Sequence, residues 1–280
     1  MQIGGPSSVH INAPSAISLT LGILGIFGLF IPAAMLASGV IRDREFKTAE
    51  LFHSTPVGPR AFILGRFSGG YIATVLAFSS VPLAILIGTQ MPWIDPEKLG
   101  PTRLFDYFYV FTTLSVVNLF VAGLIFFTVS NLTRSVFATY VTLIAFLVLY
   151  FVGLSWGREP EYRAIAAILD PLGLNTLREV TQYWTPAQKN TELVPLSGTF
   201  LINRVLWLSV AFVLLAINVL TFSFRSNAKV PKRKKADPEE TARTVEKVVL
   251  PRVTPEAAHL VLAVDRLEGD QRAVLRKALD

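Results

Sequence analysis

Three histidines are the side chains of this sequence best suited to holding a metal or moving a proton near neutral pH. They stand at positions 10, 53 and 259, whereas a hydrolytic zinc site needs two histidines one helical turn apart together with a glutamate. The sequence contains no cysteine, which excludes thiol catalysis, disulfides and cysteine-based metal sites. We interpret His10, His53 and His259 as ordinary polar residues of loops or surfaces.

Two other kinds of chemistry have recognisable motifs, and the sequence carries neither. It has no Gly-x-x-x-x-Gly-Lys-Ser/Thr loop to hold the phosphates of a nucleotide. It also has no Gly-x-Ser-x-Gly turn to present a serine nucleophile. We therefore expect no catalytic residue, no cofactor and no metal, and we expect any ATP that drives the protein to be bound by another polypeptide.

A dense group of eight charged residues lies within residues 42–66, between two long apolar stretches. Residues 42–52 contain no Gly or Pro, and Phe46, Ala49 and Phe52 recur at every third position. This spacing predicts a short amphipathic helix, ended by the Pro and Gly residues that follow. Two interpretations are open: an anchor along the membrane interface, or a docking helix that presents apolar and charged side chains to a partner.

The elements around this segment follow from the distribution of charge. Only 16% of the 280 residues are charged, against about 25% in a typical soluble domain. The charges leave five apolar runs of at least 20 residues, and about 20 helical residues cross the roughly 30 Å hydrocarbon core of a bilayer. We expect an all-α integral membrane protein, because lipid-exposed backbone must satisfy its hydrogen bonds within each helix. The predicted spans of this five-helix bundle are about 16–41, 69–90, 105–132, 136–155 and 200–224.

The rest of the chain divides around these spans. We expect residues 1–15 to be an external segment, 16–224 the transmembrane domain, and 225–280 a cytoplasmic tail that is partly disordered, since it is rich in Lys, Glu and Pro. The loop 158–203 is too long to be structureless. Its apolar spacing predicts two short helices within about 160–183, which would cap the bundle, lie on the headgroups or gate a substrate.

The basic residues predict the orientation. The loops after spans 1 and 3 and the tail hold 19 Lys or Arg, and the other two loops hold 7. The positive-inside rule therefore places the C-terminus in the cytoplasm and the N-terminus outside. Trp93, Trp156 and Trp207 fall near helix ends on the predicted outer side, where indoles prefer the interface. The net charge of +6 follows from this topology, and we expect no nucleic acid partner because no aromatic platform accompanies the basic run.

The interior of the spans differs from that of ion-coupled transporters, which place ionisable side chains there. We expect no ionisable side chain inside these spans. Their polar residues have two possible roles: they form hydrogen bonds between helices, or they line a translocation surface. Pro32 and Pro82 are predicted to kink their helices. A route without an ion relay suits energy delivered by a cytoplasmic ATPase. The polar residues concerned are Ser79, Ser80, Thr112, Thr113, Ser115, Asn118, Thr142 and Asn218.

The charged segment has a pattern beyond its amphipathic spacing. It reads Arg-Asp-Arg-Glu-Phe-Lys-Thr-Ala-Glu-Leu-Phe-His-Ser-Thr-Pro-Val from position 42, with Leu-Gly-Arg at 64–66. This resembles the coupling-helix segment of ABC-2 type transporter permeases. The resemblance implies that a helix over about 42–55 docks on a nucleotide-binding ATPase subunit and transmits its ATP-driven closure. The residues that it assigns to this contact are Phe46, Thr48, Glu50, Leu51, Phe52, Thr55 and Pro56.

Further motifs resemble one branch of that family, the bacterial permeases fused to an M1-type aminopeptidase. They include Met-Pro-Trp-Ile-Asp-Pro at 91–96, Asp-Pro-Leu-Gly at 170–173 and Leu-Pro-Arg-Val-Thr-Pro at 250–255. The resemblance implies the N-terminal permease half of such a protein. Members of the branch carry a helix before the position of Val9 and continue past Pro255 into a second permease half and a peptidase. We therefore expect this chain to lack that first helix and the peptidase.

Together these features predict the permease subunit of an ABC-2 type transporter in a bacterial plasma membrane. Such a subunit moves a substrate with energy from a separate ATPase. Its expected partners are the nucleotide-binding subunit, a second permease half or a second copy of the chain, and the lipid bilayer. The alternative is a non-transporting membrane scaffold, whose helix at 42–55 is only an anchor.

Overall fold

The structure is a computed structural model that describes residues 9–45 and 57–222. For residues 38–45 it describes the backbone only. Its contacts divide the chain into two units, Met1–Arg225 and Ser226–Asp280, and all described residues belong to the first. Within the described ranges every regular element is a helix. Five helical stretches are long and apolar enough to cross a membrane, which confirms the predicted all-α membrane bundle.

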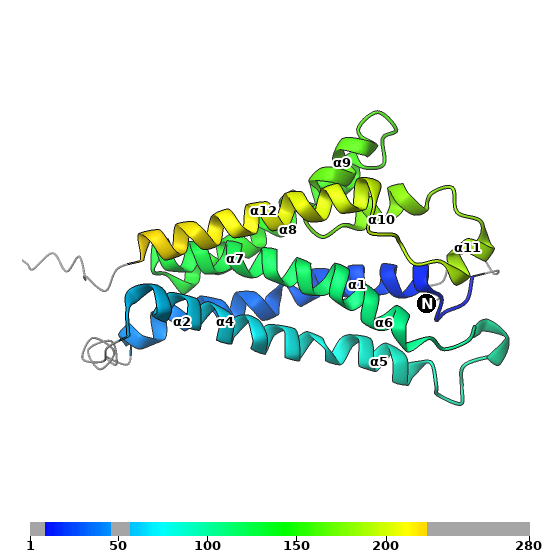
Figure 1. Cartoon of the computed structure of the whole chain (residues 1–280), viewed down its shortest axis with the longest axis horizontal. Coiled ribbons are helices and arrows are strands. Elements are labelled where there is room, and N and C mark those ends of the chain that lie inside the picture. Colours follow the sequence, from blue (N-terminus) through cyan, green and yellow to red (C-terminus); the bar gives the residue numbers. More distant parts are fainter. Residues whose placement is uncertain (1–8, 46–56, 223–280) are drawn as a thin grey trace, which may run out of the picture. The chain divides into compact units, whose positions relative to one another are not determined.

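The five spans are built from nine helical pieces. α1 (Pro14–Gly28) and the start of α2 (Phe30–Glu45) form span 1, and α4 (Pro59–Phe78) with α5 (Ser80–Gly88) forms span 2. Span 3 joins α6 (Leu104–Val110), the π-helical η2 (Phe111–Val116) and α7 (Val117–Thr133). Spans 4 and 5 are α8 (Val136–Trp156) and α12 (Gly198–Thr221). Figure 1 shows these helices running alongside one another.

Span 3 lies at the centre of the bundle. In its most apolar window 61% of the residues are buried, against 17% in spans 2 and 4. α7 contacts α2, α4, α8 and α12, and its Leu124, Phe126 and Phe127 are fully buried. Spans 2 and 4 therefore keep most of their apolar surface for lipid or for another chain.

Spans 1 and 2 are each interrupted near the middle. α1 and α2 are separated at Leu29, and α4 and α5 at Ser79. Each break lies three residues before a proline, Pro32 or Pro82, because the proline ring collides with the carbonyl four residues earlier and supplies no N–H to it. The two breaks also meet, since a Cβ atom on Gly28 would overlap the ring of Phe78. Glycine at this position lets the two interrupted spans approach closely.

Span 2 extends further than its charge-free run. Its helix begins at Pro59, whereas the predicted span begins at about 69. Arg60 and Arg66 fall in the added turns, and the Arg66 guanidinium lies 5.3 Å from the centre of the Phe62 ring. A long basic side chain near a helix end can keep its charged head at the membrane surface, so the helix need not stop at its first charge.

Short helices gather at one end of the bundle, which we call the loop end (Figure 1). They are η1 (Pro96–Lys98), α9 (Arg163–Leu169), α10 (Leu174–Thr181) and α11 (Pro186–Thr191). α9 and α10 fall in the stretch where apolar spacing predicts two short helices. At the opposite end α2 ends, α4 begins, and α7 turns into α8.

The residues just before α1 tie two of these loops together. The Asn12 side chain donates to the carbonyl of Gly100 and accepts from its N–H, both at 2.7 Å. The His10 N–H donates to Asn190 Oδ1 at 2.9 Å. The loop that carries η1 and the loop that carries α11 are thus joined through the start of the first span.

Candidate functional site

The residues that the sequence assigns to ATPase coupling cannot be placed. The segment that holds them follows α2 directly and ends just before α4. Both helices are described, and they pack against each other and against α7. The coupling residues themselves lie outside the described residues: Phe46, Thr48, Glu50, Leu51, Phe52, Thr55 and Pro56.

A buried polar cluster lies between span 3, span 5 and the loop that precedes α10. We call Asn118, Asp170, Asn203 and Arg204 the loop-end cluster; each is at most 5% exposed. Arg204 Nη1 donates to Asn118 Oδ1 at 2.7 Å, and Asn118 Nδ2 donates to the Leu172 carbonyl at 2.7 Å. The amide of span 3 therefore links a buried cation of span 5 to the backbone of the loop.

Asp170 organises that loop. Its carboxylate accepts from the N–H groups of Leu172 and Gly173 at 2.9 and 2.8 Å, and from that of Asn175 at 2.6 Å. Burial raises the pKa of the Asp170 carboxyl, while these three amides and the charge of Arg204 act in the opposite direction. The carboxylate thus sits at the start of α10, where free N–H groups and the helix dipole favour negative charge.

Gly173 is required where the loop passes the cluster. Its φ is +82°, and a Cβ atom there would overlap Nη2 of Arg204. A residue with a side chain would be disfavoured by the backbone conformation and would also collide with the guanidinium. The Asp-Pro-Leu-Gly motif is therefore a turn shaped to fit against a buried arginine.

Asn203 completes the cluster by holding the end of α9. Its Nδ2 lies 2.9 Å from the carbonyls of Ala167 and Ile168 and 2.8 Å from that of Asp170. The last carbonyls of a helix have no partner within the helix, so a side chain of span 5 supplies donors to them. α9 is thereby fixed to the bundle.

Several polar atoms around the cluster have no protein partner among the described residues. They are Nε and Nη2 of Arg204, Oδ1 of Asn203, the Tyr150 hydroxyl and the Trp207 indole nitrogen. Tyr150, Asp170 and Trp207 also line a cavity of about 410 Å³ between α8, α9 and α12. The site therefore combines fixed charges with donors available to a further acceptor beside an apolar cavity.

A second polar cluster, built without charge, lies toward the opposite end. We call Thr128, Asn131 and Asn218 the opposite-end cluster. Asn218 Nδ2 donates to Thr128 Oγ1 at 2.7 Å, and Asn218 Oδ1 accepts from Asn131 Nδ2 at 3.0 Å. These bonds join spans 3 and 5 a second time, so amides tie the same two helices at two depths.

A π-helical turn lies just before the loop-end cluster along span 3. η2 occupies Phe111–Val116, and the Tyr71 hydroxyl of span 2 donates to the Val116 carbonyl at 3.0 Å. A π turn disturbs the regular backbone ladder and is common at functional sites. A side chain of span 2 therefore supports the irregular part of the central span.

The polar residues singled out in the spans serve different purposes. Asn118 and Asn218 bond between elements, as the hydrogen-bond interpretation predicts, and the Ser115 hydroxyl is buried without a partner among the described residues. The others donate to carbonyls three or four residues earlier in their own span: Ser79, Ser80, Thr112, Thr113 and Thr142.

The expectation that the spans contain no ionisable side chain is wrong. Arg204 lies six residues inside α12, and Asp106, in α6, is 2% exposed and lies 3.4 Å from Arg103. The charge-free run that indicates span 5 starts at Val205, but the predicted bounds of about 200–224 already include Arg204, and those of about 105–132 include Asp106. The expectation overlooked both residues, although apolar residues stand on both sides of the Asn203-Arg204 pair.

In the part of the chain that the structure describes, no group of three or more His, Asp or Glu side chains could hold a metal ion. His10 lies at the loop end, and a Cβ on Gly100 would approach its ring to 3.0 Å. His53 and His259 lie outside the described residues.

Comparison with protein families gives one match over residues 11–184, to the family described as ABC-2 family transporter protein. The matched region contains spans 1 to 4, α9, α10 and the Asp-Pro-Leu-Gly turn. Comparisons with curated proteins and with solved structures give no match. Because the family match covers more than half of the 280 residues, this multi-pass membrane protein belongs to the ABC-2 transporter family.

Proposed function

We propose that the chain is the permease subunit of an ABC-2 type transporter and moves a substrate with energy from a separate ATP-binding subunit. The observation that carries this proposal is the family match, which includes spans 1 to 4 and the charged segment at 42–55. The resemblance to the N-terminal half of permeases fused to an M1 aminopeptidase supports the same role.

The packing of the described helices suggests how a displacement of the coupling segment would be transmitted through the bundle. α2 and α4 flank that segment and pack on each other and on α7. Their spans are interrupted where Gly28 meets Phe78. We propose that closure of the ATPase subunit displaces the inner halves of spans 1 and 2 and bends them at these breaks. Rocking of this kind would alternate access between the two sides of the membrane.

A single permease half does not by itself account for a closed pathway. The weak burial of spans 2 and 4 leaves apolar surface available, so we propose that a second copy or a second permease half completes the transporter. We further propose a bacterial plasma membrane location with the loop end outside.

Replacing Glu50 and Phe52 by alanine tests the coupling proposal. Both residues stand in the segment that the family resemblance assigns to the ATPase contact, so co-purification with a co-expressed ATP-binding subunit should fall at least tenfold. Membrane insertion should be unchanged. Glu97→Ala is the matched control, since it removes an exposed acid at the opposite side of the bundle. Retention of the subunit by the double variant would favour the scaffold interpretation.

The orientation has its own test. The chain has no cysteine, so single cysteines at Glu97 and at Arg60 can be labelled with a membrane-impermeant maleimide in intact cells. Glu97 is exposed in η1 at the loop end, and Arg60 is exposed in the first turn of α4. Labelling of the first position alone is expected. Labelling of the second alone would reverse the proposed topology.

A further inference from the structure

A groove of about 430 Å³ lies at the loop end between α1, the end of α8, α10 and α11. Its floor is apolar and includes Leu19 and Ile23 of α1 and Leu174 of α10. Its cationic side chains come from three elements: Arg158 after α8, Arg178 in α10 and Lys189 in α11. None of the residues that line it is acidic.

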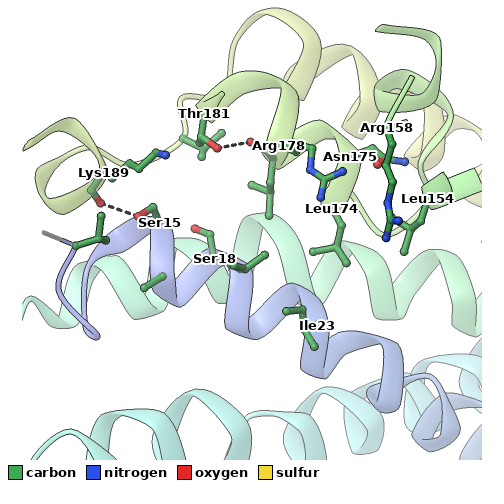
Figure 2. A pocket seen from close by; sticks show the side chains of 15 residues that line it. Ser15, Ser18, Ile23, Leu154, Arg158, Leu174, Asn175, Arg178, Thr181 and Lys189 are labelled. Carbon is green, nitrogen blue, oxygen red and sulfur yellow. Dashed lines mark hydrogen bonds between the residues drawn. The ribbon is translucent and has the colours of Figure 1, made fainter. Parts of the chain in front are cut away.

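The three cations are spread along the groove. Figure 2 shows Lys189 toward one end, Arg158 toward the other and Arg178 between them, with Ile23 on α1 below. Ser15 fixes the Lys189 end by donating its hydroxyl to the Lys189 carbonyl at 2.9 Å. α11 and α1 therefore hold this end of the groove together, while the Lys189 ammonium stays available.

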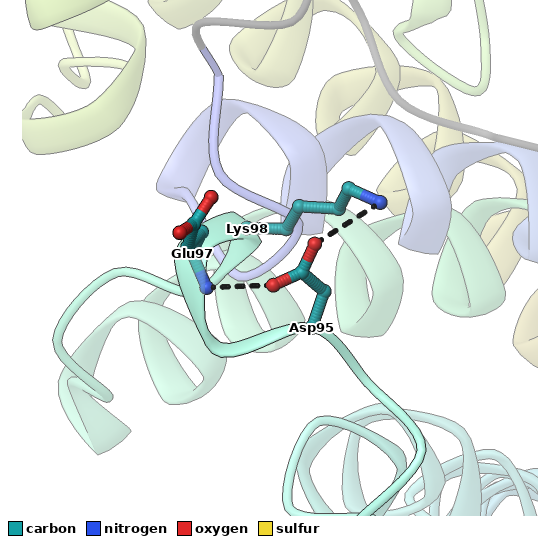
Figure 3. A network of polar contacts seen from close by, with 3 residues as sticks. All are labelled: Asp95, Glu97 and Lys98. Carbon is teal, nitrogen blue, oxygen red and sulfur yellow. Dashed lines mark hydrogen bonds and ion pairs between the residues drawn. The ribbon is translucent and has the colours of Figure 1, made fainter.

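No acid offsets these charges. Among the described residues, Arg158, Arg178 and Lys189 form no ion pair and no side-chain hydrogen bond. Other cations of the same end do have partners. Lys98 lies 3.5 Å from Asp95 (Figure 3), and Arg103 lies 3.4 Å from Asp106. Within the part of the chain that the structure describes, the three positive charges of the groove are thus without an acidic partner.

The depth of the groove matches one leaflet of a membrane. Ser15 and Ile23 both line it and are eight residues apart on α1, which corresponds to about 12 Å along the helix axis. Half of the hydrocarbon core measures about 15 Å. Leu19, between them, is 48% exposed, so the groove opens on the outside of the bundle, where lipid chains lie.

We propose that this groove binds one anionic phospholipid, with its headgroup against Arg158, Arg178 and Lys189 and an acyl chain along α1. The uncompensated charges select an anionic headgroup, and the apolar floor favours a lipid over a soluble anion. The bound lipid joins α1 to α10, which also meet where Leu174 packs on Gly22. The proposal is independent of transport, because the binding requires no ATPase subunit.

Native mass spectrometry of the full chain in a non-ionic detergent tests the proposal with phosphatidylglycerol and phosphatidylcholine as probes. Wild type should bind phosphatidylglycerol at least tenfold more tightly than phosphatidylcholine. A basic residue near anionic lipid contributes about a fivefold change in affinity. The triple variant R158A/R178A/K189A should therefore lose at least tenfold in affinity for phosphatidylglycerol.

Two comparisons separate the groove from general surface charge. Lys98→Ala removes one charge at the same end and should change phosphatidylglycerol affinity less than twofold, whereas Arg178→Ala should lower it about fivefold. Leu19→Gln leaves the charge unchanged and should also weaken binding. Millimolar glycerol phosphate should not displace the lipid.

Three outcomes would overturn the proposal. They are equal affinity for the two lipids, unchanged affinity in the triple variant, and displacement by glycerol phosphate, which would assign the charges to a soluble anion. Arg158 and Arg178 are exposed and Lys189 is half-buried, so folding should tolerate their loss. If size-exclusion chromatography shows an aggregated triple variant, the three single variants decide the question in the same titration.

Discussion

At the loop end, α12 meets α7 through the charged Arg204 and the amide of Asn118, whereas at the opposite end the same helices meet through the neutral Asn218 and Thr128. Both contacts are buried, and both use hydrogen bonds of 2.7 Å. They differ in charge and in what else they hold. The charged contact also organises α9 and α10, while the neutral one joins only the two spans.

Because one contact is charged and the other is neutral, the free-energy cost of separating α7 from α12 should differ between the two ends. Arg204 and Asp170 are both buried and act on each other by charge without forming an ion pair among the described residues. Removing one of two such charges leaves the other buried with less compensation, which costs several kcal/mol. Hydrogen bonds between membrane helices contribute only about 0.6 kcal/mol on average. We therefore expect the loop end to move as one body with its short helices, and the opposite end, nearer the coupling segment, to yield first.

Arg204→Met is expected to have the largest effect. It leaves Asn118 Oδ1 without its donor and removes the positive charge that acts on the buried Asp170. The free energy of unfolding should fall by about 3 to 5 kcal/mol, measured by denaturant unfolding in detergent. Arg60→Met, at an exposed position, is the control and should change it by less than about 0.5 kcal/mol.

A double variant sharpens the same measurement. If Arg204 and Asp170 act as a unit, adding Asp170→Asn to Arg204→Met should cost less than the sum of the two single changes. Additive losses would show that the two charges act independently and that the loop end is held by hydrogen bonds alone.

Asn203→Leu should have the next largest effect and should be local. It removes the amide that donates to three carbonyls at the end of α9, of which that of Ala167 keeps the bond from the Thr176 hydroxyl. This should lower the free energy of unfolding by about 2 kcal/mol. Hydrogen exchange should rise in α9 before it rises in α7. Asn131→Leu, the same change in the opposite-end cluster, should leave exchange in α9 unaltered; a similar rise there would mean that α9 responds to global loosening.

The sequence was informative where structure depends on neighbouring residues. Charge-free runs located all five spans, and the breaks at Leu29 and Ser79 lie where Pro32 and Pro82 predict them. These features are local, because the length of a span and the effect of a proline depend on a few consecutive residues. The apolar spacing that predicts α9 and α10 is local as well.

The loop-end cluster could not be derived in that way. Arg204 and its partner Asn118 are 86 residues apart, and Asp170 belongs to a loop that is expected to be outside the membrane. No periodicity links such positions, so the sequence left each of them as an isolated polar residue. The Asp-Pro-Leu-Gly motif resembles a family feature, but its three backbone hydrogen bonds and its close approach to Arg204 are visible only in the packed structure.

Asn218→Leu tests the neutral half of the comparison. It removes the bonds to Thr128 and Asn131, and Thr128 keeps its bond to the Leu124 carbonyl within its own helix. The expected loss is about 1 kcal/mol, and the denaturant midpoint should shift less than in Arg204→Met. An equal loss would mean that charge does not distinguish the two ends.

Tyr71→Phe should have the smallest effect and shows how much the π turn, which lies just before the loop-end cluster on span 3, depends on span 2. The hydroxyl donates to the Val116 carbonyl at the end of η2, and the ring stacks on Phe67, so the variant removes one hydrogen bond and keeps the packing. A loss of about 0.6 kcal/mol is expected, measured in the same denaturant series. Tyr140→Phe, at an exposed position of α8, is the control. A loss above about 2 kcal/mol would mean that the π turn depends on this one donor, and that a neutral hydrogen bond can hold the central span as strongly as the Asn203 contacts of the loop-end cluster do.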